Sequence, residues 1–310
     1  QCPACSEELA HTIPYLNEAF QHVAEFQNLE IAICSHCGLG VTSPERPWHM
    51  LKEFYRSVYR GPRSPCRNCT LPINDRSSVN TRALSQWMLL KAFRSIKSSD
   101  SFCDIGPGRG ATFETARFLG LNMKMFAFEP DEFCKKTLRN LGVEVFEEVF
   151  HPESKLGPAR FSTIIMSHLL EHFSGSDSVN VFQKLKSMLT EDGILLCEVP
   201  NSPMGDYGQI RTDDSPHLTF WTVDALQTVV QRSGMEVLYL STTGRRHTEV
   251  IEMLQRRDGK TDHDSQAIVK SFISSEYCPD ILGNMIIRLG HLAQNRTAYD
   301  ILSDPSFQYG

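Results

Sequence analysis

The sequence predicts an α/β protein with a doubly wound, mainly parallel sheet. Signals for short buried strands alternate with amphipathic helical segments from about residue 80 to residue 241. A glycine-rich turn follows the first strand of this series and leads directly into a helix. Repeated strand–helix units of this length need crossover connections, and such connections place helices on both faces of a parallel sheet.

The first unit of the series surrounds the glycine turn. Residues 101–105 form a short apolar run that contains Asp104, and the turn at 106–110 follows at once. Residues 111–119 then have helical periodicity and stop at Gly120. Glycines let a ligand approach the backbone closely, and the first N–H groups of the helix favour an anion. We therefore expect a cofactor site at the carboxyl end of this strand.

The later elements continue the alternation. Further strands are expected at 124–129, 143–146, 161–166, 194–199 and 235–240. Helices are expected at 80–96, from Pro130-Asp131 onward, at 181–189 and at 222–234. Thr222 is a suitable N-cap for the last helix, and Gly234 is a suitable end. A seventh strand is expected at 284–289, although a helical turn would also fit that segment.

The glycine spacing alone leaves two cofactors open. Gly106-x-Gly108-x-x-Ala111 fits the fingerprint of a nicotinamide dinucleotide site. Asp104 favours a different ligand, because a carboxylate repels a pyrophosphate and attracts an ammonium group. The amino-acid head of S-adenosylmethionine carries such an ammonium group. Glu129 does not separate the two cofactors, since both sites use an acid on a ribose at this distance from the glycines.

The segment 104–110, Asp-Ile-Gly-Pro-Gly-Arg-Gly, resembles the first motif of class I S-adenosylmethionine-dependent methyltransferases. This resemblance implies a Rossmann-like sheet of seven strands that binds S-adenosylmethionine, with Glu129 on the ribose hydroxyls. The cofactor-binding residues that it implies are Asp104, Gly106, Pro107, Gly108, Gly110, Glu129, Pro130, Ser167 and His168.

Three later segments strengthen the resemblance. Residues 167–172 look like the S-H-x-L-E-H segment that follows the fourth strand in this family. Residues 189–201 match the family around its fifth strand, and residues 216–221 resemble the H-L-x-x-F segment before the next helix. The number of ordered matches makes an accidental single-motif likeness a poor explanation.

Ten cysteines include three Cys-x-x-Cys pairs, two of them before residue 40. One such pair supplies two thiolates to a tetrahedral metal, and two pairs complete a zinc site. We expect Cys2, Cys5, Cys34 and Cys37 to hold a structural zinc ion, because four thiolates leave no position for a reactive water. Disulfides are the alternative, and we disfavour them because disulfides within Cys-x-x-Cys pairs are strained.

The third pair, Cys66 and Cys69, has three open interpretations: replacement of one of the other pairs, a second metal site, or a redox pair. The four single cysteines are expected to be small buried residues. Cys34-Ser-His-Cys37-Gly-Leu and the aromatic segment 54–59 also resemble the zinc-containing group of sugar C-methyltransferases. In that group the aromatic segment leads toward the active site.

The chain is acidic, with 31 Lys and Arg residues against 37 Asp and Glu residues. A nucleic-acid partner is not expected, since a polynucleotide path needs more positive charge. No membrane contact is expected either, because no apolar run is long enough to span a bilayer, and we expect a cytoplasmic protein. A basic cluster is either a solvated face or an anchor for a phosphate-bearing substrate; it comprises Arg56, Arg60, Arg63, Arg67 and Arg76.

His217 is the first candidate for a general base. A neutral histidine suits proton removal near pH 7, and this one follows the fifth strand, where substrate loops gather. It matches the histidine base of the zinc-containing sugar C-methyltransferases, but Pro216 stands where that group has a glutamate. O-methylation therefore stays at least as open as C-methylation, and a merely structural His217 is a further alternative.

His168, Glu171 and His172 complete the candidate catalytic set after the fourth strand. We expect His168 near the methyl donor, and Glu171 and His172 as residues that orient the loop. If this segment were helical, the two histidines would share a face, but the glutamate is misplaced for a zinc-protease motif. Tyr55 and Tyr59 either contribute hydroxyls over the substrate or only pack.

Three segments are expected: a zinc-binding module with an aromatic lid at 1–75, the S-adenosylmethionine-binding domain at 76–245, and a mostly helical extension at 246–310. The resemblance implies methyl transfer to a small acceptor, a sugar or nucleotide-linked sugar, as part of carbohydrate biosynthesis. A nicotinamide-dependent oxidoreductase and a non-catalytic zinc-dependent binding module are the alternatives.

Overall fold

The computed structural model describes residues 1–17, 20, 22–46, 48–59, 81–154, 160–202, 216–240 and 242. These residues fall in two compact units. The first unit draws on Gln1–Leu71, Asp100–Arg109 and Lys124–Thr242, and the second on Pro72–Ser99 and Gly110–Met123. The predicted tail at 246–310, with its expected seventh strand, lies outside the described residues, as do Cys66, Cys69 and four of the five arginines of the basic cluster.

A parallel five-stranded sheet forms the centre of the first unit. Its strand order is β6-β5-β4-β7-β8, and every neighbouring pair is parallel. The strands are β4 Ser101–Ile105, β5 Lys124–Phe128, β6 Glu144–Phe146, β7 Phe161–Ser167 and β8 Leu189–Glu198. The first five predicted strands are thus confirmed. The chain runs outward from β4 in both directions, so a topological switch point lies between β4 and β7, where such sheets bind ligands.

Three helices of the first unit begin near the positions that the sequence predicts. They are α4 Glu132–Asn140, α5 Ser178–Met188 and α6 Val223–Arg232, with short 3-10 turns η4 Leu170–His172 and η5 Gly175–Asp177. The Asp131 side chain accepts a hydrogen bond from the Cys134 N–H at the start of α4. Thr222 caps α6 in the same way through the Ala225 N–H. Each cap satisfies an N–H group that the helix itself cannot.

The second unit contains α2 Thr81–Phe93 and α3 Ala111–Phe118. The Trp87 indole is fully buried, and its Nε1–H donates to the Thr112 carbonyl at 2.7 Å, which joins the two helices. α3 begins directly after the glycine turn and ends before Gly120, as predicted. α2 ends at Phe93, so Ile96 lies beyond the helix in which it was expected.

The prediction of a strand at 235–240 is wrong. The parallel sheet has five strands in the described part of the chain, and the seventh predicted strand, at 284–289, lies outside that part. The segment 235–240 has a high β-propensity, but Leu238, Tyr239 and Leu240 are exposed. β-propensity measures how well side chains fit a half-buried pleated surface, and this segment has no such surface beside it among the described residues.

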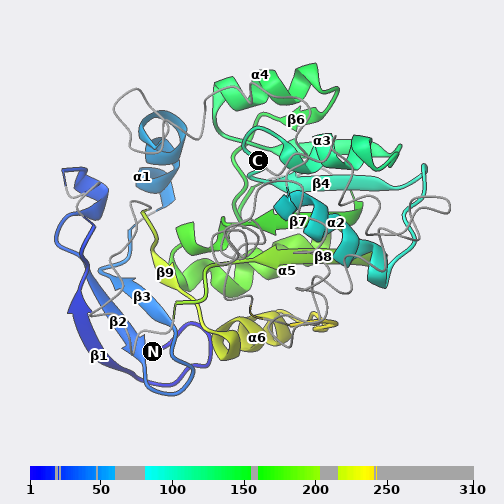
Figure 1. The fold of residues 1–310 in the computed structure, drawn as a ribbon. Helices are drawn as coiled ribbons and strands as arrows, with labels where there is room; N and C mark the ends of the chain where they lie inside the picture. The colour runs from blue at the N-terminus through cyan, green and yellow to red at the C-terminus, as the bar shows by residue number, and fades with distance from the viewer. Residues whose placement is uncertain are drawn as a thin grey trace, which may run out of the picture. The chain divides into compact units, whose positions relative to one another are not determined.

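A second sheet of the first unit is antiparallel and combines distant parts of the sequence. Its order is β1-β2-β3-β9, with β1 Leu9–Pro14, β2 Glu30–Cys34, β3 Gly40–Ser43 and β9 Thr219–Phe220. β9 lies beside β3 (Figure 1), where Gly40 pairs with Phe220 and Val41 with Thr219. The segment 216–221, predicted only to lead into a helix, is therefore also an edge strand of the amino-terminal sheet.

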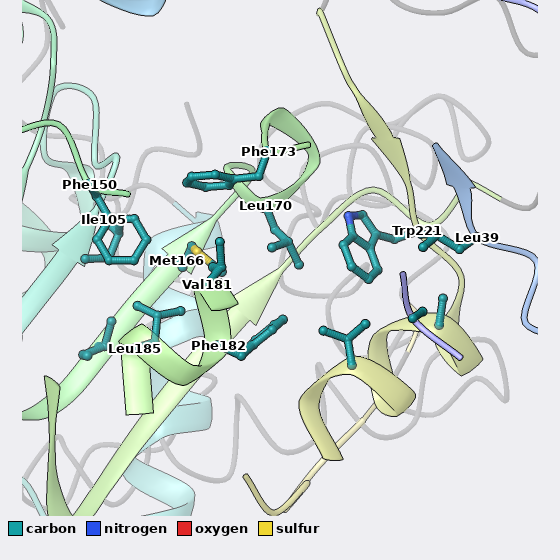
Figure 2. Packing of buried hydrophobic residues seen from close by; sticks show 14 of the residues in the cluster. Leu39, Ile105, Phe150, Met166, Leu170, Phe173, Val181, Phe182, Leu185 and Trp221 are labelled. Carbon is teal, nitrogen blue, oxygen red and sulfur yellow. The ribbon is translucent and has the colours of Figure 1, made fainter. Parts of the chain in front are cut away.

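One continuous apolar core joins this sheet to the parallel sheet. It contains Leu39, the fully buried Trp221, and Ala225 and Val229 of α6. Figure 2 shows Leu39 and Trp221 at one end of the labelled residues, and Ile105 with Phe150 at the other. Because buried apolar area is the main favourable term in folding, the two sheets stabilise each other.

A smaller aromatic core supports the segment that carries the two candidate tyrosines. This segment comprises α1 Trp48–Glu53 and the π-helical turn η2 Phe54–Val58. The buried members of the aromatic core are Phe20, Phe26, Leu29, Leu51, Phe54 and Leu218. Leu218 directly follows His217 in the sequence, so this core packs the tyrosine segment against the chain beside the candidate base.

No helix in the described ranges is long and apolar enough to cross a membrane. The two boundaries between the three predicted segments, after residues 75 and 245, stay predictions.

Gly38 offers a test of the contact between the amino-terminal module and α6. Its φ is +73°, and an added Cβ would lie 3.0 Å from the Thr222 Cγ2 atom. Gly120 has a similar φ of +69° with no atom within 4 Å of its added Cβ. Gly120→Ala should cost about 1–2 kcal/mol of unfolding free energy through backbone strain. Gly38→Ala should cost about 1 kcal/mol more through crowding. Urea denaturation measures both values, and equal losses would contradict the predicted contact.

Candidate functional site

The glycine turn lies at the switch point of the parallel sheet. Gly106 and Gly108 have φ values of +75° and +58°, which a Cβ would strain. The Gly106 N–H donates to the Phe128 carbonyl at 2.8 Å, so the turn is fixed to the end of β5. A Cβ on Gly106 would also lie 3.4 Å from the Leu169 side chain. Asp104 stands just before the turn on β4 and is 3% exposed. Asp104 is thus a buried acid directly before the glycine turn.

Glu129 connects the glycine turn to the start of α4. Its Oε2 accepts from the Gly108 N–H at 2.8 Å, and its Oε1 accepts from the Asp131 N–H at 3.0 Å. The residue is 2% exposed and lies directly after β5. Both carboxylate oxygens of Glu129 thus hold backbone N–H groups, one in the glycine turn and one at the start of α4.

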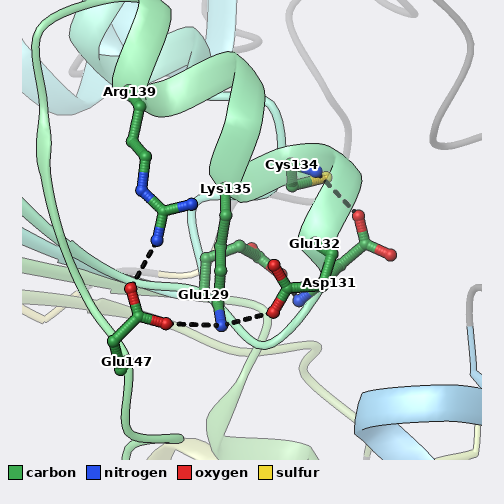
Figure 3. Close-up of polar contacts among 7 residues, drawn as sticks. All are labelled: Glu129, Asp131, Glu132, Cys134, Lys135, Arg139 and Glu147. Atoms are coloured by element: carbon green, nitrogen blue, oxygen red, sulfur yellow. Dashed lines mark hydrogen bonds and ion pairs between the residues drawn. The ribbon is translucent and has the colours of Figure 1, made fainter.

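The start of α4 carries a separate ion-pair network (Figure 3). Lys135 Nζ lies 2.8 Å from Glu132 Oε1 and 3.5 Å from Glu147 Oε2, and Arg139 also pairs with Glu147. Glu132 and Glu147 are largely exposed, so water screens these pairs and each contributes little to stability.

The end of β7 presents polar groups beside the same switch point. Ser167 donates through Oγ to Glu198 Oε2 at 2.7 Å, and the His168 N–H donates to the Glu198 carbonyl at 2.9 Å. His168 has a left-handed φ of +52°, a conformation that is strained for a residue with a Cβ. η4 begins only at Leu170, so His168 and His172 do not share a helical face. The segment is therefore not one continuous helix, and the condition for a shared face is not met.

Three imidazoles surround the buried carboxylate of Glu171. His168 Nδ1 lies 3.4 Å from Glu171 Oε1, and His217 Nε2 lies 3.8 Å from the same atom. His172 offers a third ring nitrogen within 4.8 Å of Glu171 and His217. Glu171 is 1% exposed. Burial raises the pKa of its carboxyl, but the contact with His168 and the charges of all three imidazoles lower that pKa overall.

Tyr55 reaches this group of residues from the amino-terminal module. Its hydroxyl lies 3.1 Å from His172 Nδ1, and both groups lie near the Pro216 carbonyl. Burial raises the pKa of Tyr55 well above its usual value, so the phenol stays protonated. The Tyr59 ring packs against both Tyr55 and His172. The structure thus brings the tyrosine segment and the candidate catalytic histidines together.

Backbone hydrogen bonds of the neighbouring residue fix the position of His217 between two elements. The next residue, Leu218, donates its N–H to the Glu171 carbonyl at 2.8 Å. The Leu218 carbonyl accepts from the Thr42 N–H of β3 at 2.9 Å. The His217 side chain is 13% exposed. It is therefore positioned by η4 on one side and by the amino-terminal sheet on the other.

The four predicted metal-binding cysteines meet in one cluster. Cys2 Sγ lies 3.6 Å from Cys37 Sγ, Cys5 Sγ lies 3.4 Å from Cys34 Sγ, and all four sulfur atoms are within 4.8 Å of one another. These distances are too long for disulfides. Zinc–sulfur bonds of about 2.3 Å in a tetrahedron separate the sulfurs by about 3.8 Å, so the cluster fits one zinc ion.

The thiols of the cluster differ in acidity. Burial raises the pKa of Cys2 to about 11. In Cys34 burial acts in the same direction, but N–H groups of Cys37 and His36 and the neighbouring thiols lower its pKa to about 7. Cys103 and Cys134 are fully buried and Cys197 partly so, as predicted for single cysteines.

The cysteine cluster is attached directly to α6. The Thr222 hydroxyl donates to the Cys37 carbonyl, and Arg232 donates to the carbonyls of Pro3 and Ala4. Thr222 also caps α6, so one side chain serves both elements. The cluster is thus part of the support for the chain around His217.

One contact of the tyrosine segment has no signal in the sequence. The Trp48 ring stacks on His151 with centroids 4.2 Å apart, and His151 Nε2 lies 3.6 Å from Asp177 Oδ2. Burial lowers the pKa of His151 and raises that of Asp177. Only the fold brings these residues together, since they are distant in the chain.

Comparison with known proteins identifies the parallel-sheet region. A family model described as a methyltransferase domain matches residues 79–240, more than half of the chain. The chain belongs to the S-adenosylmethionine-dependent methyltransferase family. The match covers the glycine turn, Glu129 and the group of residues around Glu171, but not the cysteine cluster of this methyltransferase.

Several solved methyltransferase structures resemble the chain weakly. An O-methyltransferase from a trans-AT PKS multienzyme of Brevibacillus brevis, in complex with S-adenosyl-L-homocysteine, is 19% identical over 37% of this chain and 40% of its own length, with a TM-score of 0.31. A S-adenosylmethionine-dependent methyltransferase from Clostridium acetobutylicum is 12% identical over 53% of this chain and 84% of its own, with a TM-score of 0.40.

The mycolic acid cyclopropane synthase CmaA1 is 14% identical over 68% of this chain and 80% of its own, with a TM-score of 0.45. The chain thus spans less than half of the first of these proteins. No curated protein matches it in sequence.

The burial of His172 predicts a loss of stability in acid. Burial lowers the pKa of this imidazole to about 4, whereas the unfolded chain has a value near 6.5. Protonation therefore favours the unfolded state. The stability is complete above about pH 6.5 and falls as the pH decreases toward 4, by about 2 kcal/mol between pH 7 and pH 5. Urea denaturation at both pH values should show this loss, and His172→Gln should remove it.

The matched control is His11→Gln, at an exposed position in β1, which should keep the full pH dependence. If His172→Gln kept it as well, a different group would be responsible.

Proposed function

We propose that this chain transfers a methyl group from S-adenosylmethionine to a small acceptor of the sugar or nucleotide-linked sugar type. The observation that carries the proposal is the acid–glycine turn at the switch point, with Glu129 held against it. Asp104, which precedes the turn, matches the ammonium group of the cofactor. The sugar assignment is supported by the resemblance to the zinc-containing sugar C-methyltransferases, through the motifs around Cys34, the aromatic segment and His217.

The turn and its neighbours fit S-adenosylmethionine on three grounds. The buried acid complements an ammonium group, the glycines admit a ligand close to the backbone, and Glu129 holds a carboxylate, the group expected on a ribose, directly against the turn. The residues proposed to hold the cofactor are Asp104, Gly106, Pro107, Gly108, Gly110, Glu129, Pro130, Ser167 and His168. When bound, the cofactor supplies a methyl group on a sulfonium, which is activated for in-line displacement.

The chain's own contribution is alignment and proton removal. His217 is the proposed general base for an acceptor hydroxyl or carbon acid, since it is partly exposed next to the end of the parallel sheet. His168 faces the cofactor side at the end of β7, and Glu171 and His172 orient the loop. Tyr55 directs a hydroxyl to the same place. O-methylation and C-methylation are both compatible with a base of this kind.

The cysteine cluster is proposed to hold a structural zinc ion through Cys2, Cys5, Cys34 and Cys37. Their sulfur separations support this assignment, and four thiolate ligands leave no position for a reactive water. The ion would stabilise an amino-terminal module whose own apolar core is small. The segments 1–75, 76–245 and 246–310 remain the proposed domain organisation, and the cytoplasm is the proposed location.

Cofactor binding separates this function from a nicotinamide-dependent oxidoreductase. Isothermal titration should show binding of S-adenosylhomocysteine and none of NAD or NADP. Asp104→Asn should weaken S-adenosylhomocysteine by about 10–100-fold, because a charge-assisted hydrogen bond to the ammonium group is lost. Glu147→Gln is the control, since it removes an exposed carboxylate from the α4 network and should leave the affinity unchanged. Binding of NAD instead of S-adenosylhomocysteine would overturn the proposal.

Metal content tests the zinc site. Native mass spectrometry of the full chain should find zinc, and Cys34→Ser should contain one ion fewer, because a four-thiolate site loses a ligand. Cys197→Ser, at a single cysteine of β8, should keep the full content. Chelation should lower the melting temperature and change the fluorescence of Trp221, which shares a core with the cluster. A wild-type protein purified without any zinc would contradict the assignment.

A further inference from the structure

The Glu171 carboxylate is buried and has imidazoles as its nearest polar side chains. The residue is 1% exposed, and within the described ranges neither Oε atom has a partner at full hydrogen-bond geometry. An isolated buried carboxylate is costly, and folded proteins pair such a group with a positive charge. The groups in reach are the imidazoles of His168 and His217, at 3.4 and 3.8 Å from Oε1. The carboxylate is therefore placed to stabilise a positive charge that forms on one of these rings.

His172 is not the ring that takes this charge at neutral pH. Burial holds its pKa at about 4, so it remains neutral. Its Nδ1 lies 3.4 Å from the Pro216 carbonyl and 3.1 Å from the Tyr55 hydroxyl, so this nitrogen faces away from the Glu171 pair. His168 itself has the left-handed φ and its side chain is 38% exposed, whereas the His217 side chain is 13% exposed. His168 lies nearer to Oε1, but His217 is the more buried ring, and burial strengthens the attraction between a charge on this ring and the carboxylate.

The backbone attaches His217 to Glu171 a second time. The N–H of Leu218 donates to the Glu171 carbonyl at 2.8 Å. The Glu171 side chain thus contacts His217, and the Glu171 backbone carbonyl binds the next residue, Leu218. In the related sugar C-methyltransferase pattern a glutamate precedes this histidine, and here Pro216 occupies that position. Glu171 supplies a carboxylate from a different element.

We propose that Glu171 is the carboxylate partner of His217, a positioning residue that holds the ring and stabilises its protonated form. This inference rests on the proposed methyl transfer. With Nε2–H directed at Glu171, Nδ1 of His217 takes the proton of the acceptor hydroxyl. The acceptor oxygen forms its bond to the methyl carbon, the carbon–sulfur bond breaks, and the electron pair stays on sulfur. The imidazolium charge then lies beside the Glu171 carboxylate.

Other titratable groups face the pair from each neighbouring element. The β7–η4 segment contributes His168 and His172, and the η2 segment contributes Tyr55 and Tyr59. β8 contributes Cys197, whose thiol pKa is raised by burial and by the charge of Glu171. Tyr55 and Cys197 stay protonated near pH 7, so they bring no charge that would replace Glu171.

An NMR titration of the histidine side chains in the full chain tests the proposal without an acceptor. S-adenosylhomocysteine is the bound probe, and His217→Gln identifies the His217 signal. In Glu171→Gln the pH midpoint of the His217 titration should fall by about 1–3 pH units. The reason is that the substitution removes an opposite charge within about 4 Å of the ring. Asp177→Asn is the matched control: it breaks the 3.6 Å pair with His151 and should leave the His217 midpoint unchanged.

Two further measurements keep the outcome decisive. If Glu171→Gln does not fold, the wild-type titration still tests the pair, since it requires a His217 midpoint above the ordinary value of about 6.5. A midpoint at or below that value, or an equal midpoint in folded Glu171→Gln, overturns the proposal. A failure of the proposed methyltransferase function is a separate result. It would appear as a wild-type protein that does not bind S-adenosylhomocysteine, whatever the pH midpoint of the His217 titration.

Discussion

The pairing of β3 with β9 is the constraint on which the candidate site depends. A hydrogen bond from the Thr42 N–H to the Leu218 carbonyl, and the register of Val41 with Thr219, hold the residue after His217 against the amino-terminal sheet. Without that pairing, nothing described on this side would fix the imidazole opposite Glu171. The same strand delivers Trp221 into the shared core. The amino-terminal module is thus a structural part of the site, although it lies outside the stretch that the family model matches.

Electrostatics at the site follow from burial. A carboxylate and three imidazoles lie within a few ångströms of one another, in surroundings where charges interact far more strongly than in water. Burial keeps His172 neutral and Tyr55 protonated, so the Glu171 charge acts on the more accessible rings. At neutral pH the Glu171 carboxylate is thus charged, whereas His172 and Tyr55 are neutral. Proton transfer requires neighbouring groups that differ in protonation state in this way.

Local signals predicted much of this molecule. The parallel strands follow from the alternation of strand and helix signals, the N-cap at Thr222 from side-chain chemistry, and the cysteine cluster from pair spacing. β9 was not predicted, because a two-residue strand has too short a pattern and depends on a partner about 180 residues away. The meeting of Glu171 with His217 was missed for the same reason. The strand at 235–240 was overpredicted because propensity does not report whether a neighbouring strand exists.

The shared core has a practical consequence for anyone who divides this chain. A fragment cut to the matched stretch 79–240 would retain β9 and Trp221 but lose β3 and Leu39. The edge of β9 would then present unpaired backbone groups beside an uncovered apolar surface, a combination that promotes edge-to-edge association between molecules. The boundary of the family match thus divides the shared core, and soluble, well-ordered protein requires the amino-terminal residues as well.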